Sequence, residues 1–165
     1  MDKKIKVLLG LVVLGLIIGT FLIKNSLRGV EPYKSYYSEG KIREVSTTKN
    51  GKLNGPFKSY YPGGQLKLKC TYKDGKKEGA AQFYFEKSGK LQARVTYKND
   101  LSEGTSKFYF ENGKLQAEMN YKAGMLDGVS KTYRSSGEII YIDNYRNSQL
   151  ESRKPFNDIE KPKVK

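Results

Sequence analysis

The sequence predicts an all-β fold, an elongated antiparallel array of repeated β-hairpins with a period of about 24 residues, preceded by an N-terminal transmembrane helix. Three observations support this prediction. A unit containing Gly and Tyr recurs along the middle of the chain, the second half of each unit alternates apolar and polar residues, and residues 7–23 carry no charge. The chain is thus expected to have a membrane segment, a repeat array and a charged tail.

The uncharged run VLLGLVVLGLIIGTFLI at residues 7–23 is the predicted membrane segment. A helix rising about 1.5 Å per residue would span roughly 25 Å, at the short end of what a bilayer core needs. No small-residue cleavage pattern and no Cys follow it, so we expect an uncleaved signal-anchor at residues 1–23 and a tether at residues 24–35.

The orientation of this anchor rests on its flanking charges. Three Lys residues precede the run, a signal-like arrangement that favours export of the rest of the chain, although five basic residues follow between residues 24 and 43. We therefore expect a single-pass protein of the cytoplasmic (inner) membrane whose repeat domain is extracytoplasmic.

The repeat is visible as a direct recurrence of sequence. NGKLNGPFKSYY at residues 50–61 returns as DGKKEGAAQFYF, NDLSEGTSKFYF and AGMLDGVSKTYR. One Gly column keeps steps of 24, 25 and 24 residues, and the longer step reflects one extra residue in the turn at residues 86–89. The predicted array covers residues 36–146, with a degenerate first copy at 36–49 followed by copies at 50–73, 74–98, 99–122 and 123–146. Residues 147–165 are expected to form a degenerate cap and a mobile basic tail.

Each copy has the pattern of one β-hairpin. Leu66, Leu68, Cys70 and Tyr72 alternate with polar residues, which is typical of a half-buried strand. A short aromatic stretch precedes this strand, and a Gly-containing turn separates the two, as a tight hairpin requires. Because an isolated hairpin is marginally stable, stacking of neighbouring copies is expected to stabilise the array.

The unit G-x-x-x-Y-[YF]-x-x-G-x-[LI]…Y-[KR]-x-G-x-x-x-G resembles the bacterial variant of the MORN repeat, which occurs in YwqK-family antitoxin proteins. The resemblance covers about two thirds of the chain. It implies an elongated sheet of hairpins with a role in binding or assembly rather than catalysis. The antitoxin label implies neutralisation of a partner protein. A cytosolic antitoxin would not need residues 7–23, whereas an immunity protein of the envelope would fit them.

Composition excludes much chemistry. The chain has 31 Lys and Arg against 17 Asp and Glu, a formal charge of +14, with no His, no Trp and one Cys. Without His there is no Ser-His-Asp or Cys-His nucleophile, and the commonest metal ligand is missing. A single Cys makes neither an internal disulfide nor a Cys-rich zinc site. We expect no enzyme activity, no cofactor and no metal.

Three sets of single residues have predicted roles. Cys70 takes the position that Val95 and Met119 hold in other copies, so we interpret it as a small buried hydrophobe. Asp143 takes the same position and marks either the end of the core or a contact with a partner. The acids before the repeat Gly are expected to belong to the loops: Glu78, Glu103 and Asp127.

Two columns of residues are candidate binding surfaces. The basic rim is the column that ends each copy: Lys49, Lys73, Lys98, Lys122 and Arg146. It could track an anionic polymer, phospholipid headgroups or an acidic protein, or it could keep the sheet soluble and discourage edge pairing. The tyrosine column is a candidate aromatic face: Tyr36, Tyr60, Tyr84, Tyr109 and Tyr133. Its rings could stack on bases or sugars, or could form cross-strand ladders.

The sequence therefore predicts a non-enzymatic, membrane-anchored repeat module for protein–protein interaction or scaffolding at the bacterial envelope, with an antitoxin- or immunity-like role. The alternative is electrostatic attachment to an anionic envelope polymer or lipid surface through the basic rim. An unidentified protein is the favoured partner, an anionic polymer or phospholipid comes second, and nucleic acid is disfavoured.

Overall fold

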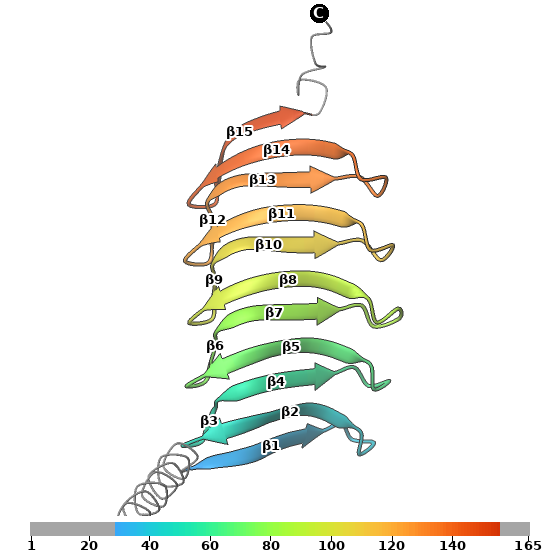
Figure 1. The fold of residues 1–165 in the computed structure, drawn as a ribbon, viewed down its shortest axis with the longest axis vertical. Coiled ribbons are helices and arrows are strands. Elements are labelled where there is room, and N and C mark those ends of the chain that lie inside the picture. The colour runs from blue at the N-terminus through green and yellow to red at the C-terminus, as the bar shows by residue number, and fades with distance from the viewer. Residues whose placement is uncertain (1–28, 156–165) are drawn as a thin grey trace, which may run out of the picture.

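The computed structural model describes residues 29–155, which form one antiparallel β-sheet (Figure 1). The strands stack along the long axis of the molecule in the order β1-β2-β4-β5-β7-β8-β10-β11-β13-β14-β15. Four two-residue strands pair beside this path. The prediction of an all-β array of antiparallel hairpins is confirmed. In the described part of the chain, no helix has the length and apolar character needed to cross a membrane, and the membrane segment predicted at residues 7–23 lies outside that part.

Five hairpins form most of the sheet. Their first strands are β1 (Val30–Tyr36), β4 (Gly55–Tyr60), β7 (Gly79–Tyr84), β10 (Gly104–Tyr109) and β13 (Gly128–Tyr133). Their second strands are β2 (Ile42–Lys49), β5 (Leu66–Lys73), β8 (Leu91–Lys98), β11 (Leu115–Lys122) and β14 (Ile139–Arg146). The short strands are β3 (Lys52–Leu53), β6 (Lys76–Lys77), β9 (Leu101–Ser102) and β12 (Met125–Leu126), and β15 (Gln149–Pro155) ends the sheet.

Every hairpin contains a β-bulge at the same place. In the second hairpin Ser59 opposes Leu68, but the next residue, Tyr60, opposes Leu66, so Lys67 is left as the extra residue. A bulge leaves one residue unpaired and re-aims its side chain. The Lys67 ammonium accordingly lies 5.5 Å from the ring centre of Tyr61. Register shifts at the same place leave Arg43, Gln92, Gln116 and Ile140 as the extra residues of the other hairpins.

Successive hairpins are joined by two-residue turns that stack on one another. Both central residues of the first turn have positive φ, 51° at Asn50 and 73° at Gly51, as a type I′ turn requires. In the next turn the Gly75 N–H donates to the Leu53 carbonyl at 2.8 Å. The loop acids accept hydrogen bonds from the following turns, with Glu78 bonded to the Asn99 N–H at 3.0 Å. Glu103 and Asp127 accept equivalent bonds from Ala123 and Asn147.

The buried residues all lie on one face of the sheet, here called the apolar face. Directly opposed pairs such as Phe57 with Cys70 and Ala81 with Val95 form a cross-strand row. The members of this face that are buried are Ser46, Phe57, Cys70, Ala81, Ala93, Val95, Ser106, Ala117, Ser130 and Asp143. The prediction that Cys70 is a buried hydrophobe is confirmed, and burial raises the pKa of its thiol to about 11.

One predicted boundary is wrong. The tether predicted at residues 24–35 is strand from Val30 onward, because β1 pairs with β2 from Val30 opposite Lys49 to Tyr36 opposite Ile42. Within the cap and tail predicted at residues 147–165, β15 pairs with β14 as far as Pro155 and ends the sheet, and residues 156–165 lie outside the described part of the chain. The backbone groups at both ends of a sheet need partners, and an edge strand can contain Pro because one of its sides is unpaired. Charged and Pro-containing segments therefore join the sheet.

Candidate functional site: an aromatic groove and a basic row

The apolar face is hollowed across β7, β8, β10 and β11. The hollow, here called the aromatic groove, has a volume of about 690 Å³. Its lining contains one ionisable acid, Glu111, and no basic residue. The lining residues are Phe83, Phe85, Gln92, Ala93, Val95, Tyr97, Ser102, Ser106, Phe108, Tyr109, Phe110, Glu111, Gln116 and Tyr121.

The aromatic groove lies where the residue of the short strand opposite the tyrosine ring is small. Lys77 of β6 lies over two rings, with its ammonium 5.8 Å from the ring centre of Tyr72 and 5.3 Å from that of Tyr97. One repeat later the equivalent residue opposite Tyr97 is Ser102, whose short side chain lines the groove. Burial raises the pKa of Tyr97 and of Tyr121, so both phenols stay neutral around pH 7.

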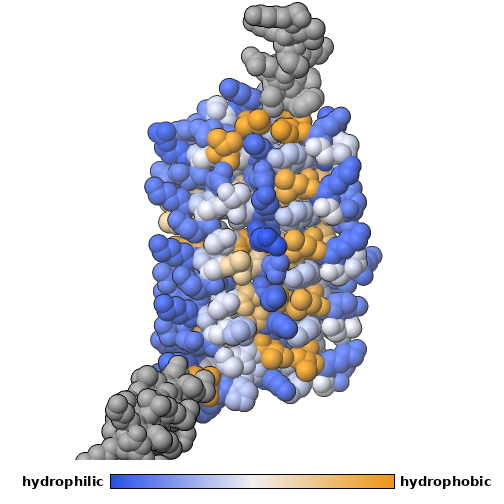
Figure 2. Space-filling model, in the orientation of Figure 1, coloured by the Kyte–Doolittle hydropathy of each residue, from blue (hydrophilic) through white to orange (hydrophobic). Residues whose placement is uncertain are grey.

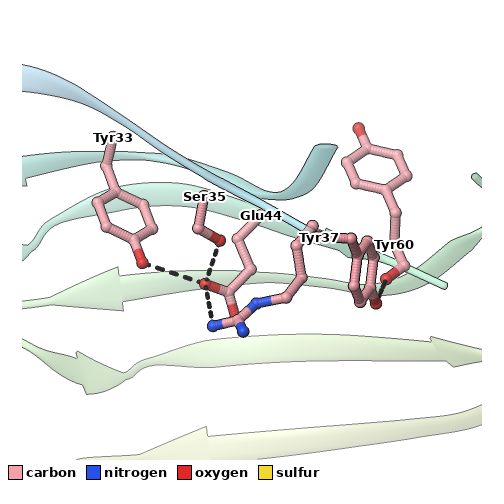
Figure 3. Close-up of polar contacts among 6 residues, drawn as sticks. Tyr33, Ser35, Tyr37, Glu44 and Tyr60 are labelled. Carbon is pink, nitrogen blue, oxygen red and sulfur yellow. Dashed lines mark hydrogen bonds and ion pairs between the residues drawn. The ribbon is translucent and has the colours of Figure 1, made fainter. Parts of the chain in front are cut away.

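Two phenylalanines mark the same stretch. In the first two hairpins the residue after the tyrosine column is Tyr37 or Tyr61. The Tyr37 hydroxyl donates to the Tyr60 carbonyl at 2.7 Å (Figure 3). The Tyr61 hydroxyl donates to the Tyr84 carbonyl at 2.9 Å. Phe85 and Phe110 take this place in the next two hairpins and line the groove. They cannot form the hydrogen bond that ties one repeat to the next.

A buried hydroxyl in the groove has no partner. Ser106 is fully buried, and its Oγ makes no hydrogen bond. Ser46, on the same face near the N-terminal end, donates its hydroxyl to the Pro56 carbonyl at 3.0 Å. A buried polar group without a partner carries the full cost of its desolvation.

Polar clusters close both ends of the apolar face. At the N-terminal end, Glu44 accepts hydrogen bonds from Tyr33 at 3.1 Å and Ser35 at 2.9 Å (Figure 3). At the C-terminal end, Asp143 accepts two from Arg153, at 2.8 Å from Nε and 2.9 Å from Nη2. These bonds from Arg153 hold the pKa of Asp143 below its usual range. The structure thus gives Asp143 a partner within the chain and places it at the end of the core.

The opposite face of the sheet, here called the polar face, carries one continuous basic row. Cross-strand partners connect its members from β1 to β15, so their side chains share a face. Seven are Lys or Arg and one is an acid. The members are Lys34, Val45, Lys58, Lys69, Gln82, Arg94, Lys107, Glu118, Lys131, Ile142 and Lys154. Figure 2 shows a hydrophilic column that crosses the strands on the visible face.

The two halves of the basic row differ in charge pairing. Glu118 lies between Lys107 and Lys131, and the Lys107 ammonium is 2.9 Å from its carboxylate. This hydrogen bond lowers the pKa of Glu118. Around this acid, Thr105, Asn120 and Val129 complete a second hollow of about 440 Å³. Toward the N-terminus the cations oppose one another directly, Lys58 facing Lys69 and Arg94 facing Lys107.

The comparison with known families agrees with this architecture. The family model described as "MORN repeat variant" matches residues 32–50, 53–74, 77–99, 102–123 and 126–147. The chain belongs to the MORN repeat variant family. No curated protein matches the chain. Among solved structures, the "Crystal Structure of TarM" is 10% identical with a TM-score of 0.41, and the match covers 85% of this chain and 24% of that chain. The chain spans about a quarter of that chain, and a likeness of this size carries no argument.

In this MORN repeat protein the basic rim lies where the long second strands end. Its members are the last residues of β2, β5, β8, β11 and β14, and Figure 1 shows these strand ends on one side of the sheet. Arg146 is paired with Glu151 at 3.0 Å. Lys73, Lys98 and Lys122 are exposed, and none has a carboxylate within 4.0 Å among residues 29–155.

The tyrosine column ends the first strand of each MORN hairpin, at the bulge. Each ring is opposed across the hairpin by Leu or Ile, as Tyr60 is by Leu66 and Tyr84 by Leu91. Tyr36 is 54% exposed and the other four are half-buried. The Tyr133 hydroxyl donates to Glu118 of the basic row at 3.2 Å.

Sequence reasoning missed most of both surfaces. The lysines that precede each Tyr by two residues, such as Lys58 and Lys107, were recognisable as a column. Lys69 and Arg94 were not, because they join the row only through pairing between strands. Within residues 29–155, no three Cys, Asp or Glu side chains are grouped to hold a metal ion.

Proposed function

We propose that this MORN repeat protein is a non-enzymatic, membrane-anchored module that binds a partner protein at the bacterial envelope, with the aromatic groove as the docking site. The observation that carries the proposal is an uncovered aromatic hollow, almost free of charge, in a chain of net charge +14. A charged ligand would be expected to settle elsewhere on such a surface.

The physical argument for a protein partner is the missing second layer. A sheet normally buries one face against another layer, and no other element of residues 29–155 packs over the groove. Removing aromatic surface from water is favourable by roughly 25 cal/mol per Å². An apolar segment from a partner protein would gain this free energy by covering the aromatic rings of the groove.

The role of such a complex is proposed from the family and from the expected anchor. The repeats resemble those of YwqK-family antitoxin proteins, and residues 7–23 are expected to hold the chain at the membrane. A scaffold or an immunity protein that neutralises a toxin at the envelope fits both features. In either role the groove would hold a segment of the partner.

A peptide selection tests the proposal. A random peptide library displayed on phage is selected on the full chain in a neutral detergent, and the enriched peptides are measured against two variants. Phe85→Ala with Phe110→Ala removes two groove rings. Leu101→Ala with Met125→Ala removes two apolar side chains that are 49% and 42% exposed and do not line the groove.

We expect apolar peptides to be enriched and to lose roughly tenfold or more in affinity for the groove variant, the effect of losing two buried rings. The control variant should bind them as the original chain does. Failure to enrich any peptide, or equal binding to both variants, would contradict the proposal.

The second candidate function is electrostatic attachment to an anionic envelope polymer or lipid surface through the basic rim. It is favoured because no carboxylate of residues 29–155 lies within 4.0 Å of the ammonium groups of Lys73, Lys98 and Lys122. Binding of this kind should collapse as ionic strength rises, whereas peptide binding in the groove should largely persist.

A further inference from the structure

The N-terminal half of the basic row contains a charge conflict that the fold does not resolve. Like charges directly opposite on neighbouring strands destabilise a sheet. The row contains two such pairs, Lys58 opposite Lys69 and Arg94 opposite Lys107. Of these four cations, Lys107 alone is within 4.0 Å of a carboxylate in the described residues.

The C-terminal half of the same row shows how an acid between two cations prevents like charges from facing each other. Glu118 separates Lys107 from Lys131, accepts a bond from the first and lies opposite the second. An acid at the position of Lys69 or Arg94 would neutralise the other half in the same way. Uncompensated positive charge in a line is instead the arrangement that attracts an external anion.

We propose that the basic row binds a linear, base-free phosphate polymer that lies across the strands, along the long axis of the sheet. The row is one residue wide and crosses the eleven strands of the main path, roughly 48 Å at the usual strand spacing. A thread of closely spaced negative charges matches this shape. An acidic loop of a protein would contact only a few of these strands.

The neighbouring side chains favour a polymer without bases. Base-binding surfaces offer free aromatic faces between their cations. Beside this row the rings of the tyrosine column are opposed by Leu or Ile, and four of the five are half-buried. The hydroxyl of Tyr133 is directed into the row, where it contacts Glu118. Charge, rather than stacking, is the interaction that the row offers.

The inference does not depend on the aromatic groove, because the row lies on the other face. Its test uses the full chain in a neutral detergent with inorganic polyphosphate as the probe, at several salt concentrations. The row variant is Lys58→Gln, Lys69→Gln and Arg94→Gln. The control is Lys87→Gln, Lys90→Gln and Arg134→Gln, which removes the same charge from exposed residues of the hairpin turns, outside both the basic row and the basic rim.

We expect the row variant to bind polyphosphate roughly tenfold or more weakly, and the salt dependence of its log affinity to flatten by about 2, which is 0.7 for each of three lost contacts. The turn control should stay within about threefold of the original chain, since it loses only long-range attraction. Unfolding supplies a second readout: the row variant should be at least as resistant to urea as the original chain, because like charges have been removed.

Several results would overturn the proposal. They are absence of polyphosphate binding, an equal loss in both variants, or a row variant that is less stable as well as weaker in binding. Oligodeoxythymidylate that binds as tightly at equal charge would favour nucleic acid instead. Vesicles of phosphatidylglycerol that displace polyphosphate from the original chain but not from the row variant would favour a membrane surface.

Discussion

The two ends of the apolar face are closed and its middle is open. At the ends, Glu44 and Asp143 are each surrounded by donors from the chain itself. In the middle, aromatic rings from four strands line an uncovered groove. Among the described residues, the buried hydroxyls of Ser106 in the groove and of Ser130 opposite Asp143 make no hydrogen bond. The same repeat unit therefore places hydrogen-bonded acids at the ends of the apolar face and an open aromatic surface between them.

This difference separates stability from binding within one repeating architecture. The end clusters terminate a sheet that would otherwise expose a core with no neighbour, as end copies of stacked arrays must. The middle copies have neighbours on both sides and can give up hydrogen bonds that the ends need. Changes at the ends should therefore affect folding, and changes in the middle should affect binding.

The largest effect is expected at the C-terminal cluster. Asp143→Ala removes a buried carboxylate and leaves Arg153 without its partner, so the free energy of unfolding should fall by roughly 2 kcal/mol. Urea unfolding of the full chain measures it. Glu151→Ala is the control, because its pair with Arg146 is exposed and should contribute about 0–1 kcal/mol. Equal losses in the two variants would refute the capping role of Asp143.

A pair of glycines compares two neighbouring repeats. Gly55 has φ +112°, and an added Cβ would lie 2.6 Å from the Thr47 hydroxyl, so Gly55→Ala combines backbone strain with a clash. Gly79 has φ +79°, and its added Cβ would meet nothing within 4 Å. We expect Gly79→Ala to cost about 1 kcal/mol and Gly55→Ala about 2 kcal/mol. Indistinguishable urea midpoints would show that the contact with Thr47 is easily relieved.

The pH dependence of stability should follow Asp143. The pKa of Asp143 is lowered in the folded state by the hydrogen bonds from Arg153. Its stabilisation is therefore complete above the unfolded pKa, about 3.9, and is lost as the pH falls through the lower folded value. The stability advantage of the original chain over Asp143→Asn should be constant near neutral pH and shrink below about pH 4. An advantage that persists unchanged to pH 2 would contradict this assignment.

The smallest effects should distinguish two buried serines. Ser46→Ala breaks the bond to the Pro56 carbonyl and should cost about 1 kcal/mol. Ser106→Ala removes a hydroxyl that has no partner, so stability should be unchanged or slightly higher. Thermal unfolding of both variants tests the difference. A clear loss of stability from Ser106→Ala would mean that its hydroxyl is satisfied in the folded chain.

The sequence predicted the hairpins well because each depends on neighbouring residues. The alternation from Leu66 to Tyr72 and the Gly-containing turns are local signals, and the structure has a hairpin in each predicted copy. The extra residue at 86–89 is also present, since the Phe85 N–H reaches the Lys90 carbonyl, whereas the Tyr61 N–H reaches Gln65.

The functional surfaces depend on pairing that local patterns do not contain. Simple alternation along the strand places Gln92 and Gln116 on the polar face. The bulges instead bring both side chains to the aromatic groove of the apolar face. Arg94 faces Lys107 because β8 of one repeat pairs with β10 of the next, and this pairing depends on the register between the two strands. The strand at Val30–Tyr36 carries only part of the repeat pattern and the strand at Gln149–Pro155 lacks it, and both form because the neighbouring strand offers unpaired backbone groups.

The most direct test of the account is site-specific photo-crosslinking in the cells that make this protein. A photoreactive residue is placed at Gln116, which lines the aromatic groove, or at Val129, which is 47% exposed and lines the hollow on the polar face. We predict a discrete adduct with one protein from Gln116 that disappears when Phe85 and Phe110 are changed to Ala, and no such adduct from Val129. The same adduct from both positions, or none from Gln116, would contradict the claim that the open middle of the apolar face binds a partner protein.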